Sequence, residues 1–298
     1  MTRTILLSLL AAGAAPIGIY AVAQRQAPAL APAEITQAAP ASDWRDIPES
    51  DLLLMDVAGG GRVVIQLAPD FAPVHVDNIR KLAAQRWWDG TSINRVQDNY
   101  VVQWGDPTER KALPADVTAK PPEEYLRAET GLEPEWIPWP DPYARRTGFA
   151  GGWPVGGDGR GKIWLAHCYA MVGVGRNMAP DTGSGAELYA VIGQAPRHLD
   201  RNIALVGRVI EGMEYLSSRP RGTAQLGFYD DPRQRIPIDS IRPMAEVDPG
   251  ARSTHQYLTG KSFAAFREAR ANRRDPFFNV PAGGADVCNI PVPIRRKP

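Results

Sequence analysis

The chain has 298 residues, of which 34 are basic and 33 acidic, so its formal net charge is only +1. This balance excludes the broad basic surface of a protein that wraps nucleic acid or adheres to an anionic membrane, so we expect neither partner. Glycine and proline, 28 of each, are frequent enough to predict turns and short strands, and they favour β structure over a helical bundle. The two cysteines, Cys168 and Cys288, are too few for a disulfide-rich scaffold or a structural zinc site.

The N-terminus has the pattern of a signal peptide. One charge, Arg3, precedes an uncharged run of Leu, Ala and Ile that ends in Ala21-Val22-Ala23, the small-x-small sequence that signal peptidase cleaves. We therefore expect residues 1–23 to be removed and the protein to be periplasmic or secreted. The alternative is an uncleaved membrane anchor, although glycine and proline interrupt this run.

Residues 24–45 come next, and their first part is mostly Ala, Pro and Gln. Such a composition buries little apolar surface and predicts a disordered linker.

The body of the chain reads as short strands with few helices. Residues 52–57 and 62–67 are apolar runs joined by a glycine-rich turn, which predicts a β-hairpin. Residues 71–85 have apolar side chains at helical spacing, Pro73 in the first turn and Asp70 as a candidate N-cap. Further strands are predicted at 93–96, 100–104, 171–174, 188–192, 203–209 and 236–241, and further helices at 211–217 and 262–272.

One segment, residues 108–161, differs in composition from its surroundings. It is rich in Pro, Glu, Arg and Gly, and it contains Trp136, Trp139 and Trp153. We interpret it as an insert in a domain that spans residues 46–244, followed by a C-terminal extension at 245–298 that packs on that domain. Tryptophans in such a loop more often fix the loop to its domain than form a peptide-binding patch.

Six blocks of residues, in order along the chain, resemble the cyclophilins, a family of peptidyl-prolyl cis-trans isomerases. Arg95, Gln103 and Gly105-Asp106 match that family's pattern of F-H-R-V, an aromatic residue and Q-G-G-D. The blocks are residues 72–82, 88–91, 93–108, 173–189, 199–200 and 206–212. The resemblance extends over residues 51–106 and 164–243 and leaves out the insert and the tail.

The resemblance implies a mainly β fold, a closed eight-stranded antiparallel barrel capped by two helices. It also implies isomerisation of X–Pro bonds in proline-containing polypeptides, here exported proteins, by a monomer that needs no cofactor or metal. Arg95 and Gln103 are the expected catalytic residues. The expected substrate-binding residues are Tyr100, Val101, Glu187, Leu188, His198 and Leu199.

Several positions depart from the family pattern. Glu187 replaces a glutamine, His198 a tryptophan and Trp104 a glycine, Asn94 replaces the histidine before the arginine, and Asn202 or Ile203 stands where a histidine is usual. These changes leave open a second function, a barrel that binds proline-containing segments as a chaperone without turnover.

The sequence leaves open whether Cys168 is a nucleophile and whether it forms a disulfide with Cys288. A hydrolase that uses Cys168 with His167 or His198 is disfavoured, because neighbours on a strand point to opposite faces and no oxyanion motif is visible. In an oxidising compartment Cys168 and Cys288 either form a disulfide, or Cys168 is a buried strand residue and Cys288 a surface thiol.

Overall fold

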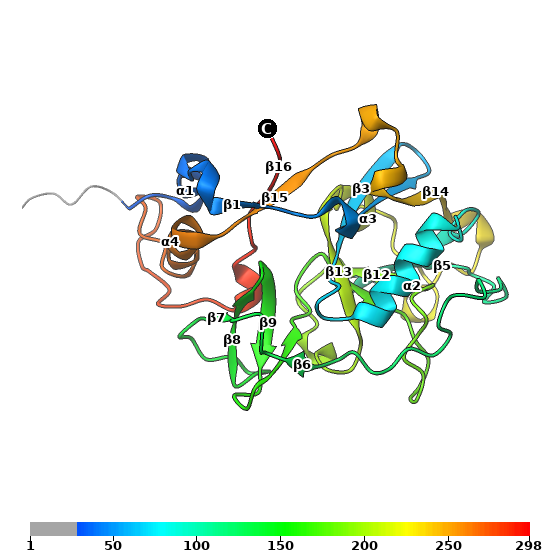
Figure 1. Ribbon diagram of the computed structural model, residues 1–298, viewed down its shortest axis with the longest axis horizontal. Coiled ribbons are helices and arrows are strands. Elements are labelled where there is room, and N and C mark those ends of the chain that lie inside the picture. Colours follow the sequence, from blue (N-terminus) through cyan, green and yellow to red (C-terminus); the bar gives the residue numbers. More distant parts are fainter. Residues whose placement is uncertain (1–28) are drawn as a thin grey trace, which may run out of the picture.

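The computed structural model describes residues 29–298, so the predicted signal peptide and residues 24–28 of the predicted linker lie outside it. Its centre is a closed antiparallel barrel of eight strands, in the order β11-β12-β5-β4-β14-β2-β3-β13 (Figure 1). The fold class predicted from the sequence is therefore confirmed. The barrel strands are β2 (Leu52–Val57), β3 (Gly61–Leu67), β4 (Ser92–Val96), β5 (Val101–Gly105), β11 (Met171–Val174), β12 (Leu188–Val191), β13 (Leu205–Glu211) and β14 (Ile236–Pro243).

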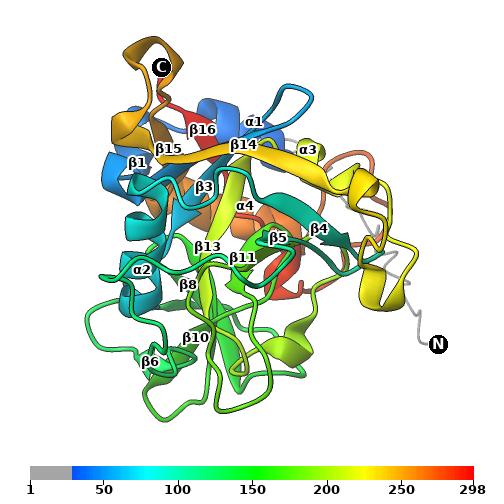
Figure 2. The same ribbon diagram turned by 90° about the vertical axis from the view of Figure 1, so that its right-hand side faces the viewer.

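Two helices pack on the barrel, α2 (Pro73–Ala84) and the short α3 (Glu214–Ser217). Figure 2 shows them on different sides of it. Helix α2 buries Val76, Ile79 and Leu82 in the barrel core. The predicted N-cap Asp70 is not used: the carboxylate of Glu124 accepts hydrogen bonds from the backbone N–H groups of residues 74 and 75 at 2.9 and 3.0 Å. A residue about 50 positions away thus satisfies the start of this helix.

The predicted insert is not a loop but most of a second sheet. Five antiparallel strands lie in the order β6-β10-β9-β8-β7. Strand β10, the last of them in the chain, lies just beyond the predicted boundary at residue 161. The five strands are β6 (Arg127–Ala128), β7 (Glu135–Trp136), β8 (Arg146–Ala150), β9 (Trp153–Gly157) and β10 (Lys162–Leu165). Trp153 is buried in the core of this sheet, and Trp136 and Trp139 pack against it. The tryptophans therefore fix the insert in place.

The C-terminal extension completes this second core. It contains helix α4 (Gly260–Ala271) and strands β15 (His255–Leu258) and β16 (Ile294–Arg296). Phe263 and Phe266 of α4 pack with the apolar side chains of the insert, and Tyr257 of β15 packs against outward-facing residues of β2 and β3. In Figure 1 the helices α1 and α4 and the strands β7 to β9 lie beside the barrel.

The prediction of a disordered linker at 24–45 is wrong for the residues that the structure describes. Helix α1 (Pro32–Ala38) packs against α4, and β1 (Trp44–Asp46) pairs with β15 in a three-stranded sheet, β1-β15-β16. The buried side chain of Trp44 belongs to the second core. A partner more than 200 residues away in the chain orders this segment, and local composition does not reveal such a partner. Within residues 29–298 there is no helix with the length and apolar character needed to span a bilayer.

A disulfide joins the two parts of the second core. Cys168 and Cys288 are bonded, with their Cα atoms 5.0 Å apart and 120 positions apart in the chain. The bond connects the segment after β10 to the C-terminal tail, and Cys168 is buried. This arrangement also excludes the cysteine hydrolase, because a bonded sulfur is not a nucleophile.

The disulfide closes a long loop in the unfolded chain, so breaking it should lower stability markedly. On the chain-entropy model, loss of the bond lowers the free energy of unfolding by about 4–5 kcal/mol. Guanidinium unfolding with and without dithiothreitol measures this difference. Cys288→Ala, which lacks the bond from the start, is the control and should not respond to the reductant. Equal unfolding midpoints for the oxidised and reduced wild type would contradict the expectation.

Candidate functional site

Three of the polar and aromatic side chains on the outer face of the barrel belong to one row across adjacent strands. Arg95 on β4 pairs with Gln103 on β5, and Gln103 pairs with Tyr189 on β12. The next partner in the row is Gly173 on β11. Directly opposed residues on antiparallel strands have Cβ atoms about 4.5–5.5 Å apart. The register alone therefore brings the side chains of the row together.

An irregularity in β4 directs Arg95 outward. The register shifts between Ile93, which faces the barrel core opposite Trp104, and Arg95. Asn94 is the extra residue at this β-bulge. A bulge changes which face of the sheet the following side chain occupies. Arg95 thus reaches the same groove as Gln103 although it is two positions after the inward-facing Ile93 and regular alternation would turn it inward.

The guanidinium of Arg95 is held by neighbours but not saturated by them. Its Nε donates to the carbonyl oxygen of Leu226 at 2.7 Å, Nη1 to Gln103 Oε1 at 3.1 Å, and Nη2 to Gln97 Oε1. Among residues 29–298 these contacts use three of its five N–H groups, which leaves one on each terminal nitrogen. Burial lowers the pKa of Arg95, but arginine starts so high that it stays protonated at neutral pH. Two charged donors remain for a ligand.

Aromatic rings border Arg95 on two sides. Its Cζ atom lies 5.8 Å from the ring centroid of Tyr100 and 5.4 Å from that of Phe228. Tyr100 in turn stacks on the exposed His198, with centroids 6.3 Å apart. Rings at these distances attract the cation and limit its movement.

The row lies in a groove with a volume of about 790 Å³. The apolar side chains near the row include Tyr100, Val101, Tyr189, Leu199, Ile203 and Phe228. At the other end the groove is lined by the start of the insert, Asp106 to Ala119, and by residues 174–187. This volume is ample for a peptide of a few residues.

Asp106 organises the start of the insert beside this groove. Its carboxylate accepts hydrogen bonds from the backbone N–H groups of Thr108, Arg110 and Lys111 at 2.7 to 3.0 Å. Burial opposes ionisation, but these bonds outweigh it and lower the pKa of Asp106 to about 2. The carboxylate is therefore ionised at neutral pH and fixes the turn through which the insert enters the groove wall.

Glu187 places a carboxyl group in the groove next to Gln103. A Cβ atom on Gly105 would lie 1.9 Å from its Oε1, so only glycine leaves room for it there. Burial raises the pKa of Glu187 to about 8, although hydrogen bonds from Gln103, Asn94 and the Asp106 backbone favour the ionised form. At neutral pH the group is largely protonated.

Six of the eight residues predicted for the site line the groove, and two do not. Arg95, Gln103, Tyr100, Val101, Glu187 and Leu199 all line it. His198 lies at its rim, stacked on Tyr100. The prediction for Leu188 is wrong: this side chain is buried inside the barrel, opposite Trp104. Alternation along β12 turns the next residue, Tyr189, into the groove.

The groove residues that were not predicted as site residues from the sequence include Tyr189, Ile203, Leu226 and Phe228. The alternation of β12 was a usable signal for Tyr189, because Leu188 and Ala190 are both apolar core residues. For Leu226 and Phe228 no local pattern exists. Their loop reaches Arg95 through a single β-bridge between Arg95 and Phe228, which only the folded structure shows.

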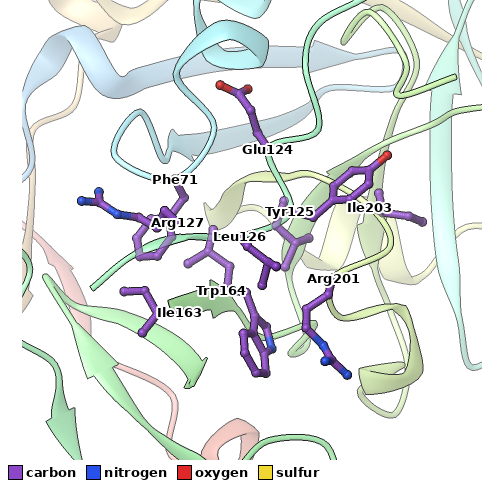
Figure 3. Close-up of a pocket in the computed structure, with 11 residues that line it drawn as sticks. Phe71, Glu124, Tyr125, Leu126, Arg127, Ile163, Trp164, Arg201 and Ile203 are labelled. Carbon is purple, nitrogen blue, oxygen red and sulfur yellow. The ribbon is translucent and has the colours of Figure 1, made fainter. Parts of the chain in front are cut away.

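A smaller cavity lies between the barrel and the second sheet (Figure 3). Its volume is about 10 Å³, which is room for no more than one water molecule. Arg201 lies over the ring of Trp164, with its Cζ 4.9 Å from the ring centroid. This space is too small for a substrate. Across residues 29–298 no cluster of three or more His, Cys, Asp or Glu side chains has the arrangement to hold a metal ion.

The raised pKa of Glu187 predicts a pH-dependent stability. Glutamate titrates near 4.5 when unperturbed and near 8 in this fold. Between these values the folded state holds a proton that the unfolded chain has lost, so the free energy of unfolding falls as pH rises through this interval. Glu187→Gln removes the titration. The free energy of unfolding of this variant, measured with urea and compared with that of wild type, should therefore become relatively larger from pH 5 to pH 9. A difference between the two proteins that does not change with pH would contradict this.

A family model described as cyclophilin type peptidyl-prolyl cis-trans isomerase/CLD matches residues 52–242. Among solved structures, the cyclophilin AquaCyp293 from Hirschia baltica is similar, with a TM-score of 0.67 and 23% identity over 85% of this chain and 93% of that one. A cyclophilin-type isomerase from Cryptosporidium parvum, solved in the presence of the dipeptide Ala-Pro, gives a TM-score of 0.40 and 13% identity over 64% of this chain and 98% of that one. No curated protein matches the sequence.

Proposed function

Because this chain belongs to the cyclophilin-type peptidyl-prolyl cis-trans isomerases, we propose that its groove catalyses rotation about X–Pro bonds in proteins outside the cytoplasm. The observation that supports this most directly is the row of Arg95, Gln103 and Tyr189, in which a charged donor, an amide and an apolar ring lie side by side. These three groups are what the reaction requires.

The reaction is slow because the peptide nitrogen shares its lone pair with the carbonyl group. The rotation barrier is about 18–20 kcal/mol, and uncatalysed exchange takes tens to hundreds of seconds. In the twisted transition state the lone pair is localised on the prolyl nitrogen. A free N–H of Arg95 donates a hydrogen bond to that lone pair, an interaction that is absent from the planar ground state. An interaction made only in the transition state accelerates the reaction.

Gln103 and the apolar wall hold the substrate in place. Oε1 of Gln103 accepts from Arg95, and its amide nitrogen has a hydrogen to donate to the substrate carbonyl oxygen. The pyrrolidine ring packs against Tyr100, Val101, Tyr189 and Leu199, which surround the row. Fixing the ring while the preceding carbonyl rotates holds the substrate in the geometry that leads to the twisted transition state. No covalent intermediate is needed.

The proposed location outside the cytoplasm is supported by two features. The first 23 residues have the pattern of a cleaved signal peptide. The disulfide between Cys168 and Cys288 is a bond that persists in oxidising compartments. The clients would then be exported polypeptides whose folding waits on proline isomerisation.

Removal of the Arg95 side chain should abolish most of the catalysis. We expect Arg95→Ala to lower kcat/KM by about 100-fold to 1,000-fold, the usual loss when one transition-state donor is removed. A protease-coupled assay on a proline-containing tetrapeptide measures this. The matched control is Arg233→Ala, because Arg233 is exposed and pairs with Asp231 away from the groove. Full activity in a folded Arg95→Ala variant would remove Arg95 from the mechanism. Absence of turnover in the wild type would instead favour a barrel that binds proline-containing segments as a chaperone.

If the protein is exported, its signal peptide should be cleaved. Expressed with its complete N-terminus in a bacterial host, the protein should reach the periplasm and begin at Gln24, because cleavage follows Ala23. Mass spectrometry of the periplasmic fraction identifies the N-terminus, and Ala23→Asp, which spoils the small-x-small site, should leave the precursor intact. An intact chain in the cytoplasmic fraction would contradict export.

A further inference from the structure

Behind the groove, three buried side chains form a continuous hydrogen-bonded chain. Asp200 Oδ1 and His167 Nδ1 are 2.9 Å apart, and His167 Nε2 and the hydroxyl oxygen of Tyr189 are 3.0 Å apart. The three residues are at most 5% exposed. Tyr189 alone also lines the groove. The chain therefore links the interior of the molecule to one wall of the proposed active site.

The position of the Tyr189 ring depends on a glycine in the neighbouring strand. A Cβ atom on Gly173 would lie 2.3 Å from both Cζ and the hydroxyl oxygen of Tyr189. The ring therefore lies across β11, over Gly173, and its hydroxyl group reaches His167 on the far side. The ring of His167 is nearly parallel to that of Tyr189, with an interplanar angle of 14°.

The charges along the chain fix the direction of its hydrogen bonds. Burial opposes ionisation of Asp200, but hydrogen bonds from His167 and the charge of Arg197 outweigh it and lower the pKa of Asp200. Burial also lowers the pKa of His167, which favours the neutral imidazole. Burial raises the pKa of Tyr189, which keeps its hydroxyl proton. Nδ1–H therefore donates to the Asp200 carboxylate, and Nε2 accepts from Tyr189.

Asp200 is itself held from three other directions. It accepts hydrogen bonds from the His167 backbone N–H at 3.0 Å, from Trp164 Nε1 at 3.2 Å and from Arg197 Nε at 2.6 Å. Arg197 also pairs with Asp141 of the insert, at 3.0 Å. His167 immediately precedes Cys168 of the disulfide. The insert and the tail thus hold the far end of this chain in place.

We propose that His167, held by Asp200, is a positioning residue for the isomerase, which fixes the Tyr189 ring as the wall against which the substrate proline packs. This inference rests on the proposed function of the groove. Without the hydrogen bond to His167, the Tyr189 hydroxyl loses its buried partner and the ring loses the contact that keeps it over Gly173. A displaced ring weakens binding of the substrate in its ground state and in its transition state by a similar factor. KM therefore rises while kcat changes little.

The experiment is a double-mutant cycle with a graded set of His167 variants. Tyr189→Phe removes the hydroxyl group but keeps the ring. His167→Asn keeps a nitrogen near the position of Nδ1, which donates to Asp200, but its side chain is too short to reach Tyr189. His167→Gln instead places an amide oxygen near the position of Nε2, where it accepts from Tyr189. Tyr215→Phe, at an exposed tyrosine outside the groove, is the matched control. For each variant, kcat/KM, the Kd of an Ala-Pro-containing peptide and the melting temperature are measured.

We expect Tyr189→Phe and His167→Asn each to weaken peptide binding and to lower kcat/KM by about threefold to tenfold, the usual effect of one lost hydrogen bond. The double variant should be no worse than either single variant, His167→Gln should recover most of the loss, and Tyr215→Phe should match wild type. A purely structural role for His167 predicts a lower melting temperature and effects on binding that add to those of Tyr189→Phe. Additive effects, or an unchanged Kd and kcat/KM in Tyr189→Phe, would overturn the proposal.

Failure of the isomerase proposal and failure of the His167 variants to fold can each be distinguished from failure of the positioning role. If the wild type binds the peptide without turnover, the isomerase proposal fails while the Kd cycle still decides the role of His167. If the His167 variants do not fold, Tyr189→Phe decides alone, because a weakened Kd supports the proposal and an unchanged one overturns it.

Discussion

The alternation of side chains in a closed barrel is the constraint on which the site depends. Closure leaves each barrel strand with one face turned to a filled core and one face turned outward. Ile93, Trp104 and Leu188 fill the interior. Their direct neighbours Gln103 and Tyr189 therefore face outward, and the β-bulge at Asn94 brings Arg95 to the same side, so the three side chains meet in one row. The chemistry of the groove is therefore a consequence of strand register. A shift of one residue in β5 or β12 would bury the polar row and expose the core.

The second core supports one wall of the groove from behind. Its strands and α4 come from the insert and the C-terminal extension, and the disulfide holds them together. From this body Asp141 reaches Arg197, and Arg197 reaches Asp200 behind Tyr189. Breaking one member of a buried ionic network leaves the others unpaired at a large energetic penalty. The insert is thus part of the support for the active face, in addition to lining its far end.

Electrostatics divide the groove into two halves. At one end Arg95 stays charged between two aromatic rings. At the other end Glu187 is kept largely neutral by burial, close to Gln103 and to the ionised Asp106. A neutral carboxyl group leaves the cationic donor as the dominant charge beside the row. The replacement of glutamine by glutamate at this position therefore preserves, near neutral pH, a side chain without net charge that both donates and accepts hydrogen bonds.

The barrel, the family, and Arg95 and Gln103 of the row could be predicted from the amino-acid sequence, because apolar alternation and the motif around Arg95 are local patterns. It also identified Glu187 and the alternative pairing states of the two cysteines. The folded structure was needed to show which residue of the Leu188-Tyr189 pair faces the groove, since both are apolar enough for either face. The order of residues 32–45, the capping of α2 by Glu124 and the contact of Leu226 with Arg95 all depend on partners 40 or more positions away in the chain. Hydrogen bonds and packing between such distant segments produce no periodic pattern in the sequence, because the two partners become neighbours only when the chain folds.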